Sequence, residues 1–476
     1  MTDRGLRLLQ SMMFGIEPQD LADELAAFRA EQKAIYAGSP DETVKAEAIE
    51  LLAENAVDLQ SVLPEWHLKC KDRHGDRAVC DGMLATESDK SLALLEELGY
   101  KDAAELARAH IASIKASQLA RLTRLSMAGV TNTWWGNDYA AGLRETMRRG
   151  AAMVTTNPVL VNVARNEDPG YWTPVRDAIR EAHPTYDPVQ LAYAMTIQVV
   201  LYNARLLRPI WELTDGKMGY VSLQLSPKAA DNAEVMIREA HWVWEQLEKG
   251  LDGTPNCVFK APGTKAGIDL VCDAVSHGMG VNVTVNFALP QQIAFAGAIE
   301  RNSICKMSYR TQMDGRVDDP VGDELKDAGV SDWDEVKKWC TTAIRQREYR
   351  LLSLPPQQGG MGCTKSIPLP ASGRGPWNIE RSITDGPVPI FLTVFPNRQS
   401  EFDETERILN PKGMWEELPA GYLDKLYKSR LFRQAYEPDG MTVDEFDTYK
   451  PVVDTLTQFN KSYDEFVAWV AGCACS

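Results

Sequence analysis

Long apolar runs are absent from this sequence of 476 residues. The longest apolar stretch, around residues 199–207, is broken by Asn203 and Arg205. A membrane-spanning helix needs about 20 consecutive apolar residues. The N-terminus also lacks an apolar segment of signal-peptide type. We therefore expect a soluble cytoplasmic protein with no membrane partner.

Cysteine and positive charge are also in short supply. The nine cysteines have no regular spacing, which excludes a disulfide framework and favours reduced thiols. The 51 Lys and Arg residues against 67 Asp and Glu residues give a net charge of −16. Since an acidic chain is repelled by phosphate backbones, we expect no nucleic-acid partner. A small anionic substrate stays possible, because one local Arg or Lys outweighs the mean field.

Two cofactor signatures are missing or incomplete. No G-x-G-x-x-G follows the first predicted strand, which argues against a dinucleotide site. A His–Cys–His–Cys group at positions 67, 70, 74 and 80 has borderline metal-ligand spacing, but it lies among charged residues typical of a solvated loop. We expect no metal and no organic cofactor.

The pattern of apolar residues changes twice along the chain. Helical spacing runs through residues 1–120 and returns over 411–476. Between them, β-branched runs alternate with helical stretches, at 128–131, 152–155, 220–225, 257–260, 281–285, 304–308, 349–353 and 389–394. Eight such units predict a (β/α)8 TIM barrel of the α/β class over residues 121–410, with an open doubly wound sheet as the alternative. The N- and C-terminal segments are predicted to be α-helical extensions, whose apolar stripes favour a homo-oligomer.

Polar residues fall near the carboxyl ends of the predicted strands. Residues two apart in a strand share a face, and a buried strand should be apolar at such positions. Barrel enzymes assemble their sites at these strand ends. The polar positions are Asn132, Thr155, Asn157, Ser222, Gln224, Lys260, Asn282 and Thr284.

Lys260 is the most informative of these residues. It ends an apolar strand and is followed by Ala-Pro-Gly, so the side chain cannot easily reach solvent along a helix. Burial lowers the pKa of an amine, and a neutral amine can attack a carbonyl and form a Schiff base. The alternative interpretation is an exposed lysine at the end of a strand.

Four segments of the chain resemble the transaldolase family, in the order of the family. Residues 153–158 (MVTTNP) resemble its second strand, 221–226 (VSLQLS) its third, 258–267 (VFKAPGTKAG) the fourth with the Schiff-base lysine, and 281–288 (VNVTVNFA) the fifth. The resemblance covers roughly residues 125–400 and implies a (β/α)8 barrel with a class I aldolase mechanism. It implies that Lys260 is the nucleophile and that Thr284 holds a catalytic water. Substrate hydroxyls would be bound by Asn157 and Ser308, with Thr155 and Asn282 beside them.

The acid/base position departs from the family pattern. The first strand of the family ends in an Asp, and the matching residue here is Asn132, which cannot take a proton at neutral pH. Asp138 is the candidate to replace it, but the start of a helix is the favoured interpretation of that residue. Gln224 stands where transaldolases have Glu. Related sugar-phosphate aldolases of the fructose-6-phosphate aldolase type carry Gln there with a Tyr on strand six, which we match to Tyr309.

The phosphate end departs from the pattern as well. The family uses an Arg after strand six and a Ser-x-Arg on strand seven. Arg316 is the nearest match to the first, although its distance from the predicted strand is long. Ser353 matches the serine, but Pro355 occupies the second arginine position. The pair Trp134–Trp135 suggests a remodelled mouth, although such a pair often only packs.

We therefore predict a transaldolase-like enzyme. It would transfer or release a dihydroxyacetone-type unit from a ketose or ketose phosphate through a lysine Schiff base. The alternative is a non-catalytic barrel that binds a sugar or serves assembly, because both acidic positions, 132 and 224, carry amides.

Overall fold

The computed structural model describes residues 3–14, 17–70 and 81–472. Eight parallel strands form one sheet in the order β7-β6-β5-β4-β3-β2-β1-β8, with β7 and β8 side by side at its two ends. The strands are β1 Thr133–Asn137, β2 Met153–Thr155, β3 Tyr220–Gln224, β4 Cys257–Pro262, β5 Gly280–Thr284, β6 Ser308–Met313, β7 Ser366–Ala371 and β8 Ile390–Val394. The predicted (β/α)8 barrel with helical extensions is confirmed.

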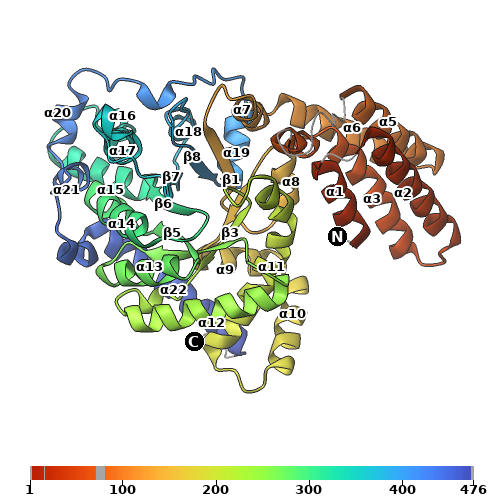
Figure 1. The fold of residues 1–476 in the computed structure, drawn as a ribbon, viewed down its shortest axis with the longest axis horizontal. Helices are drawn as coiled ribbons and strands as arrows, with labels where there is room; N and C mark the ends of the chain where they lie inside the picture. Colours follow the sequence, from red (N-terminus) through yellow and green to blue (C-terminus); the bar gives the residue numbers. More distant parts are fainter. Residues whose placement is uncertain (1–2, 15–16, 71–80, 473–476) are drawn as a thin grey trace.

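The extension before the barrel is helical, as predicted. It contains α1 Asp3–Phe14, α2 Pro18–Gly38, α3 Glu42–Leu59, η1 Leu63–Cys70, α5 Asp81–Glu97, α6 Lys101–Ala116 and α7 Gln118–Met127. In Figure 1 the first of these helices form a lobe beside the barrel, and α7 lies against β1. None of the helices in the described part of the chain is long and apolar enough to cross a membrane.

The segments that follow β1 to β5 differ strongly in length. They are α8 Leu143–Arg148 after β1, then α9 Pro158–Glu167, α10 Pro169–Ala182 and α11 Pro188–Leu213 after β2. η2 Pro227–Ala229 and α12 Ala233–Leu251 follow β3, α13 Lys265–Ser276 follows β4, and α14 Leu289–Asn302 follows β5.

The connection after β6 contains several helices, whereas the helices directly after β7 and β8 are short. After β6 come α15 Asp314–Asp327, α16 Trp333–Lys337, α17 Cys340–Glu348, η3 Tyr349–Ser353 and η4 Pro356–Gln358. α18 Pro376–Glu380 and α19 Pro396–Asp403 follow β7 and β8. The chain then continues through η5 Gly413–Trp415, α20 Tyr422–Leu426, α21 Arg430–Tyr436, η6 Val443–Thr448 and α22 Lys450–Ala471.

Three of the eight predicted strands are wrong. Residues 128–131 form the turn after α7, and β1 begins at Thr133. Residues 304–308 largely precede β6, which runs from Ser308 to Met313. Residues 349–353 are a π-helical end to α17, and the seventh strand is Ser366–Ala371. These shifts move every predicted site residue on strands one, six and seven.

The seventh strand is unusual because it contains Pro368 and Pro370. Residues two apart in a strand direct their N–H groups to the same side, and proline has none. β7 pairs with β6 through six aligned residues, whereas no ladder joins β7 to β8. The two prolines therefore explain why the barrel is not closed by hydrogen bonds at this seam.

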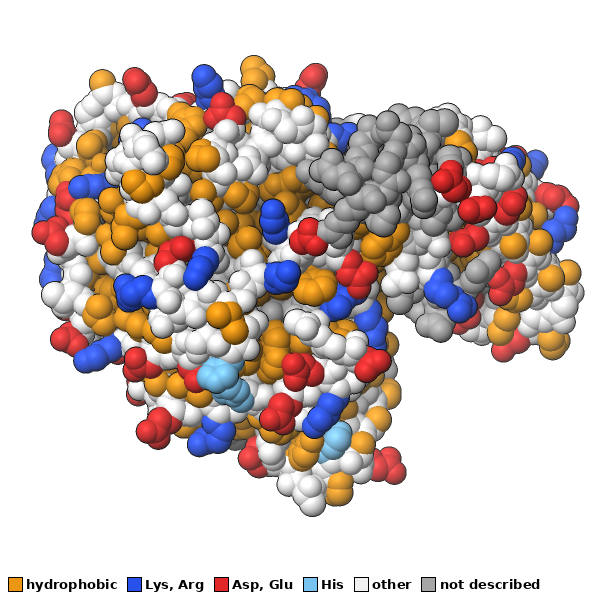
Figure 2. All heavy atoms as spheres, in the orientation of Figure 1, with side chains coloured by type: hydrophobic (Ala, Val, Ile, Leu, Met, Phe, Trp, Pro, Cys, Tyr) orange, Lys and Arg blue, Asp and Glu red, His pale blue; other side chains and the backbone are white. Residues whose placement is uncertain are grey.

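The N-terminal lobe is joined to the barrel by a buried charge network. Arg148 on α8 donates to Asp58 on α3 at 2.7 Å, and Arg144 pairs with Asp58 and Glu54. Burial alone would raise the pKa of Asp58, but the charges of Arg148 and Arg144 hold it below its ordinary value. Figure 2 shows that the rest of this face carries acidic and basic side chains interspersed.

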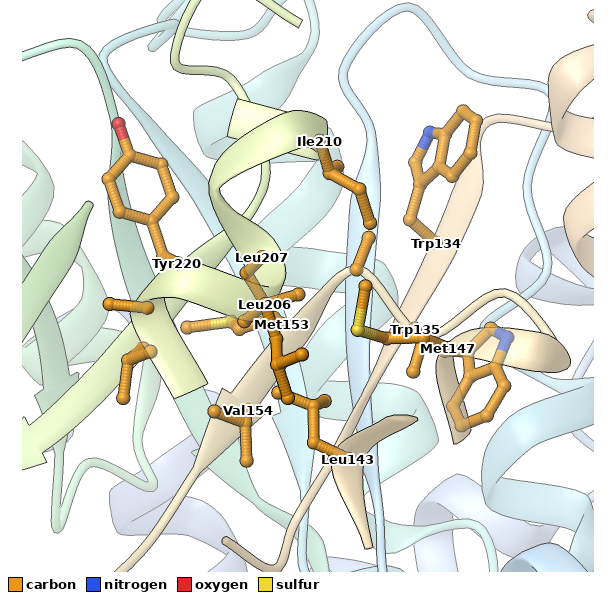
Figure 3. Close-up of a cluster of buried hydrophobic side chains, with 14 of the residues drawn as sticks. Trp134, Trp135, Leu143, Met147, Met153, Val154, Leu206, Leu207, Ile210 and Tyr220 are labelled. Atoms are coloured by element: carbon orange, nitrogen blue, oxygen red, sulfur yellow. The ribbon is translucent and has the colours of Figure 1, made fainter. Parts of the chain in front are cut away.

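Trp134 and Trp135 pack in the core and do not wall the barrel mouth. Trp134 stacks on Trp66 of the N-terminal lobe with ring centroids 5.7 Å apart. Trp135 donates through Nε1 to Thr123 of α7 at 2.9 Å. Figure 3 shows Trp134 and Trp135 among apolar side chains from β1, β2 and α11, with Met147 beside Trp135. The pair therefore anchors the first strand against the lobe.

Candidate active site at the carboxyl ends of the strands

Lys260 lies inside the barrel near the end of β4. Its side chain is 7% exposed, and Nζ donates to the carbonyl oxygen of Thr156, just past β2, at 2.7 Å. In the sheet it pairs laterally with Gln224 of β3 and Asn282 of β5. Burial lowers the pKa of Lys260, because the ammonium loses its hydration. This is the environment that a Schiff-base lysine requires.

Asp138 is the acidic group that faces this lysine. It follows directly after β1, is 4% exposed, and accepts a hydrogen bond of 2.5 Å from the hydroxyl of Thr155. Burial raises the pKa of Asp138, while the charge of Lys260 and the Thr155 hydroxyl oppose the rise. Conversely, Asp138 opposes the lowering of the Lys260 pKa. Burial thus disfavours the charged form of each group, while the charge of the other favours it.

The position of Asp138 corrects the expectation for Asn132. Asn132 precedes β1 and donates through its side chain to Gly386 at 3.0 Å, while its own carbonyl accepts from Ile390 at the start of β8. It therefore lies at the opposite end of the barrel from Lys260. The error came from ending the first strand six residues too early, so that a residue before β1 took the place of the residue after it.

Inside the barrel, short polar side chains link the strands around the lysine. Asn282 donates to the hydroxyl of Ser222 at 3.1 Å, across β4, and accepts from Thr311 of β6 at 2.5 Å. Thr284 is buried, and its hydroxyl lies 3.7 Å from the sulfur of Met313. Because β3 and β5 are separated by β4, the Ser222–Asn282 contact runs through the barrel interior. Thr155, Asn282 and Thr284 thus share the interior with Lys260.

Two amides provide hydrogen-bonding capacity that no described residue uses. The Oε1 atom of Gln224 is buried without a partner, and both polar atoms of the Asn286 side chain are buried and unpaired. Asn157, at the start of α9, accepts from Leu160 at 3.1 Å, which leaves its NH2 group for other contacts. Buried unpaired polar groups are rare in proteins and typical of ligand sites. Sequence reasoning missed Asn286, although it lies within the fifth-strand segment.

Tyr309 and Ser308 do not belong to this site. Both begin β6, and the Ser308 hydroxyl accepts from the backbone N–H of Val281 at 3.2 Å. The Tyr309 ring packs edge-on against Tyr220 and Phe391, at centroid distances of 6.1 and 5.7 Å. Tyr220 starts β3 four residues before Gln224, about 13 Å lower at the usual rise of a strand. On β6, Thr311 and Met313 contact Asn282 and Thr284 instead.

Ser353 is also removed from the site, because it ends the π-helical turn after α17. The residues that follow the true seventh strand are Ser372, Gly373 and Arg374, a Ser-x-Arg segment. Ser372 has a φ of +56°, a conformation that non-glycine residues keep only where the surroundings impose it. The Ser-x-Arg pattern is thus present in the sequence, but it was not recognised because the seventh strand was predicted at 349–353.

Arg316 lies close to this segment, on the first turn of α15. Burial lowers the pKa of Arg316, and the positive charge of the nearby Arg374 lowers it further. Gly315 allows this approach, because a Cβ there would lie 2.3 Å from the Arg374 guanidinium. Arg374 itself pairs with Asp319 at 2.8 Å. Arg316 and Arg374 thus place two positive charges near one another, after β6 and β7.

A buried network holds the two arginine loops together. Asp314, which follows β6, pairs with Arg345 of α17 at 2.5 Å and accepts from Asn378 at 3.0 Å. Asn378 in turn accepts from the backbone N–H of Arg374 at 2.8 Å. Asp314 thereby connects the segment of Arg316 with that of Arg374.

Breaking this network should destabilise the fold. Arg345→Met leaves the Asp314 carboxyl buried and unpaired, and we expect the free energy of unfolding to fall by about 3–5 kcal/mol in urea titrations. Arg347→Met is the matched control on the same helix, because Arg347 pairs with Glu437 near the surface. That change should cost about 1 kcal/mol or less. Equal losses for the two variants would contradict the structural role of Arg345.

The C-terminal helix lies over this end of the barrel. α22 contacts α9, η2 and α15, which follow β2, β3 and β6. Its residue Phe459 lies beneath the Arg316 guanidinium, 5.9 Å from the ring centroid. The helix therefore restricts the approach of water and substrate to the strand ends.

A cavity of about 770 Å³ lies outside the barrel wall. Its lining is mainly apolar and comes from α9, α10, α11 and α22, including Val175, Val199 and Phe466. It meets the site only where Thr155 and Thr156 form part of both walls. The catalytic groups themselves do not line it.

The possible metal ligands His67, Cys70, His74 and Cys80 cannot be compared with the structure as a group, because residues 71–80 lie outside the described residues. Five other cysteines are free thiols, as expected: Cys257, Cys272, Cys305, Cys340 and Cys363.

Comparison with known proteins also finds similarity to transaldolases. Residues 142–346 match the model of the transaldolase/fructose-6-phosphate aldolase family. A "Transaldolase 1" of Streptomyces avermitilis is 30% identical over 206 residues, which are 41% of this chain and 52% of that protein. A "Transaldolase" of Thermobifida fusca is 31% identical over 183 residues, 37% of this chain and 47% of that protein. The chain thus spans about half the length of the curated relatives it matches.

The matched segment begins after Asp138 and ends before β7, so Asp138 and the Ser-x-Arg segment are located by the structure alone. Lys260, Gln224 and Thr284 all lie within the match. Over residues 142–346, which contain β2 to β6, the chain is similar to the transaldolase/fructose-6-phosphate aldolase family.

Proposed function

We propose that this protein is a class I aldolase of the transaldolase type, with Lys260 as the Schiff-base nucleophile. The observation that supports this most is the buried amine at the carboxyl end of β4, beside a buried carboxyl group on β1. A lysine in solvent would be protonated at neutral pH and could not attack a carbonyl. The interior of the barrel supplies the low polarity that lowers the pKa of Lys260 and so favours the neutral amine.

In this proposal Lys260 attacks the ketone carbon of a ketose, and loss of water gives a protonated imine. Asp138 takes the proton from the hydroxyl on the carbon that lies two positions from the imine carbon. The bond between that carbon and its neighbour next to the imine carbon then breaks, and the electrons of this bond enter the imine. An aldehyde leaves, and a three-carbon enamine stays on the lysine. Attack of this enamine on a second aldehyde is transfer, whereas protonation and hydrolysis release dihydroxyacetone.

Neutral groups would bind the hydroxyls of the three-carbon unit. Asn157 has a free NH2 group, and Gln224 and Asn286 have unpaired polar atoms. Thr284 and Gln224 are the groups proposed to hold the water that forms and hydrolyses the imine. A polyol needs short donors and acceptors of this kind, because charged groups would be costly in the dry interior.

The non-catalytic alternative has lost much of its support. It rested on amides at both acidic positions, and the first of these is now Asp138 rather than Asn132. The second acidic position carries the amide Gln224. This favours a mechanism in which a single carboxyl group, that of Asp138, moves the proton. The following assay distinguishes the aldolase from a barrel that binds sugar without converting it.

The assay supplies fructose 6-phosphate alone and with an acceptor aldose phosphate, using the full chain. The proposal expects release of dihydroxyacetone in the first case or a new ketose phosphate in the second, abolished by Lys260→Met. Binding of the sugar with no product in either case would support the non-catalytic barrel.

The phosphate of the substrate is proposed to lie between Arg316, Arg374 and Ser372. Arg374→Ala should raise KM for the phosphorylated ketose about 10- to 100-fold, because a hydrogen bond between charged groups contributes about 1.5–3 kcal/mol. KM for unphosphorylated fructose should stay within about 3-fold of its original value, since that sugar offers the arginine no charge. Steady-state kinetics with both sugars tests this. An equal rise for both would show that Arg374 only maintains the loop.

The location and assembly of the protein stay predictions. We propose a cytoplasmic enzyme that acts on a small sugar or sugar phosphate and forms a homo-oligomer through its helical extensions. Light scattering of the full chain measures the assembly state directly. We also propose residues 1–120, 121–410 and 411–476 as the units of the chain.

A further inference from the structure

Three side chains on the outside of the barrel, His241, Asp273 and His277, form a group that the proposed reaction does not use. His241 is on α12, after β3, and the other two are one turn apart on α13, after β4. One potential ligand atom from each lies within 4.8 Å of the others. In Figure 2 the larger patch of histidine lies low on this face, over α12 and α13. We infer that this group is a zinc-binding site.

The distances in the group suit a tetrahedral ion. His241 Nε2 lies 2.7 Å from one carboxylate oxygen of Asp273, and His277 Nδ1 lies 3.6 Å from the other. Two ligands at about 2.05 Å from a tetrahedral zinc are about 3.3 Å apart. The two observed distances fall on both sides of this value and the third pair of ligand atoms lies within 4.8 Å, so side-chain rotation would have to bring the three groups together around one ion. His277 Nδ1 also lies 2.8 Å from the backbone carbonyl oxygen of Asp273, a contact that the ion would replace.

The chemistry of the donors favours zinc over the common hard cations. Imidazole nitrogen and carboxylate oxygen are ordinary zinc ligands, whereas Mg²⁺ and Ca²⁺ prefer oxygen alone. The carboxylate of Asp273 is not neutralised by lysine or arginine, since its ion-pair partners among the described residues are the two histidines. The side chains are 40%, 25% and 56% exposed, in chain order, so an ion can reach them from solvent and keep a water as fourth ligand.

Zinc at this place would connect α12 to α13. These helices follow the strands that carry Gln224 and Lys260. Since the ion binds the folded protein and not the separated helices, it would stabilise this sector of the barrel by mass action. The site is independent of the aldolase proposal, because none of its residues touches the barrel interior groups described above.

The test is calorimetric titration of ZnCl2 into the full chain, with MgCl2 as the comparison cation. We expect one zinc per chain at this site with micromolar affinity, no response to magnesium, and a thermal midpoint that rises by a few degrees with zinc. His241→Ala and His277→Ala should each weaken the binding at least about 10-fold, because each removes one of three ligands. The Co²⁺-bound protein should show no thiolate charge-transfer band, since no sulfur takes part.

His110→Ala is the matched control. His110 pairs with Glu145 at 2.8 Å, a histidine–carboxylate pair that lies outside the group of three. This variant should bind zinc as the unchanged protein does. Circular dichroism of the zinc-free variants checks that each is folded. The inference is overturned if His241→Ala and His277→Ala, both folded, bind zinc as tightly as the unchanged chain, or if a thiolate band shows that cysteine holds the ion.

Discussion

Lys260→Met should reduce aldol cleavage or transfer by at least about 10³-fold, because Lys260 is the only buried lysine among the described residues. Methionine has a similar length and suits the buried position, which is 7% exposed, so the variant should fold. Product formation by the purified variant is the measurement.

Lys265→Met is the matched control for this change. Lys265 lies five residues further along, at the start of α13, with 63% of its side chain exposed and a surface ion pair to Asp444. Its replacement should leave the rate within about 2-fold, because exposed ion pairs contribute little. Full activity of the Lys260→Met variant would show that Lys260 is not the nucleophile.

Asp138→Asn should lower kcat by about 10² to 10⁴-fold, the usual contribution of a positioned acid or base. Asparagine keeps the shape of the side chain but cannot carry the proton. The hydroxyl of Thr155, which donates to Asp138 at 2.5 Å, can still donate to the amide oxygen. The loss should therefore appear in kcat far more than in stability or in sugar binding.

The pH profile separates a proton carrier from a packing residue. Lys260 must be neutral to attack, so kcat/KM rises as the pH rises through its lowered pKa. The charge of Asp138 raises that pKa, and its removal should move the rise in kcat/KM to lower pH. Asn132→Ala is the control, since Asn132 lies at the other end of β1 and should change kcat by less than about 3-fold. A larger effect at Asn132 than at Asp138 would invert our placement of the acid/base group.

The part of the site that could be predicted lies on β2 to β5. Their apolar residues alternate with polar ones near the carboxyl end, and this places Thr155, Gln224, Lys260, Asn282 and Thr284 correctly in the barrel. Within these strands, parity alone decides which side chains face inward. The structure agrees with that rule in the contact of Ser222 with Asn282.

The strands that were misplaced break the rule for physical reasons. On β6, Arg310 and Gln312 are polar residues that face outward, where Arg310 pairs with the buried Glu348 and Gln312 donates to Thr341. On β7 the two prolines resemble a turn, because proline is rare inside a sheet. The buried partners that make β6 acceptable as a strand come from α17, and their proximity cannot be deduced from local pattern.

Asp138 illustrates the same limit at the site itself. In sequence it follows Trp-Trp-Gly-Asn, which has no β-branched residue and resembles the start of a helix. Only the pairing of β1 with β8, through five aligned residues, shows that this segment is a strand and that Asp138 follows its end. The carboxyl group expected at position 132 is therefore found six positions later, at Asp138.

The central claim is that Lys260 forms an imine with a ketose. Borohydride reduction of the full chain with fructose 6-phosphate or dihydroxyacetone, followed by peptide mass spectrometry, measures this directly. We predict a stable mass increase on the peptide that contains Lys260, lost in Lys260→Met and retained in Lys265→Met. Equal labelling of Lys260→Met, or no labelling of the unchanged protein with either sugar, would contradict the account.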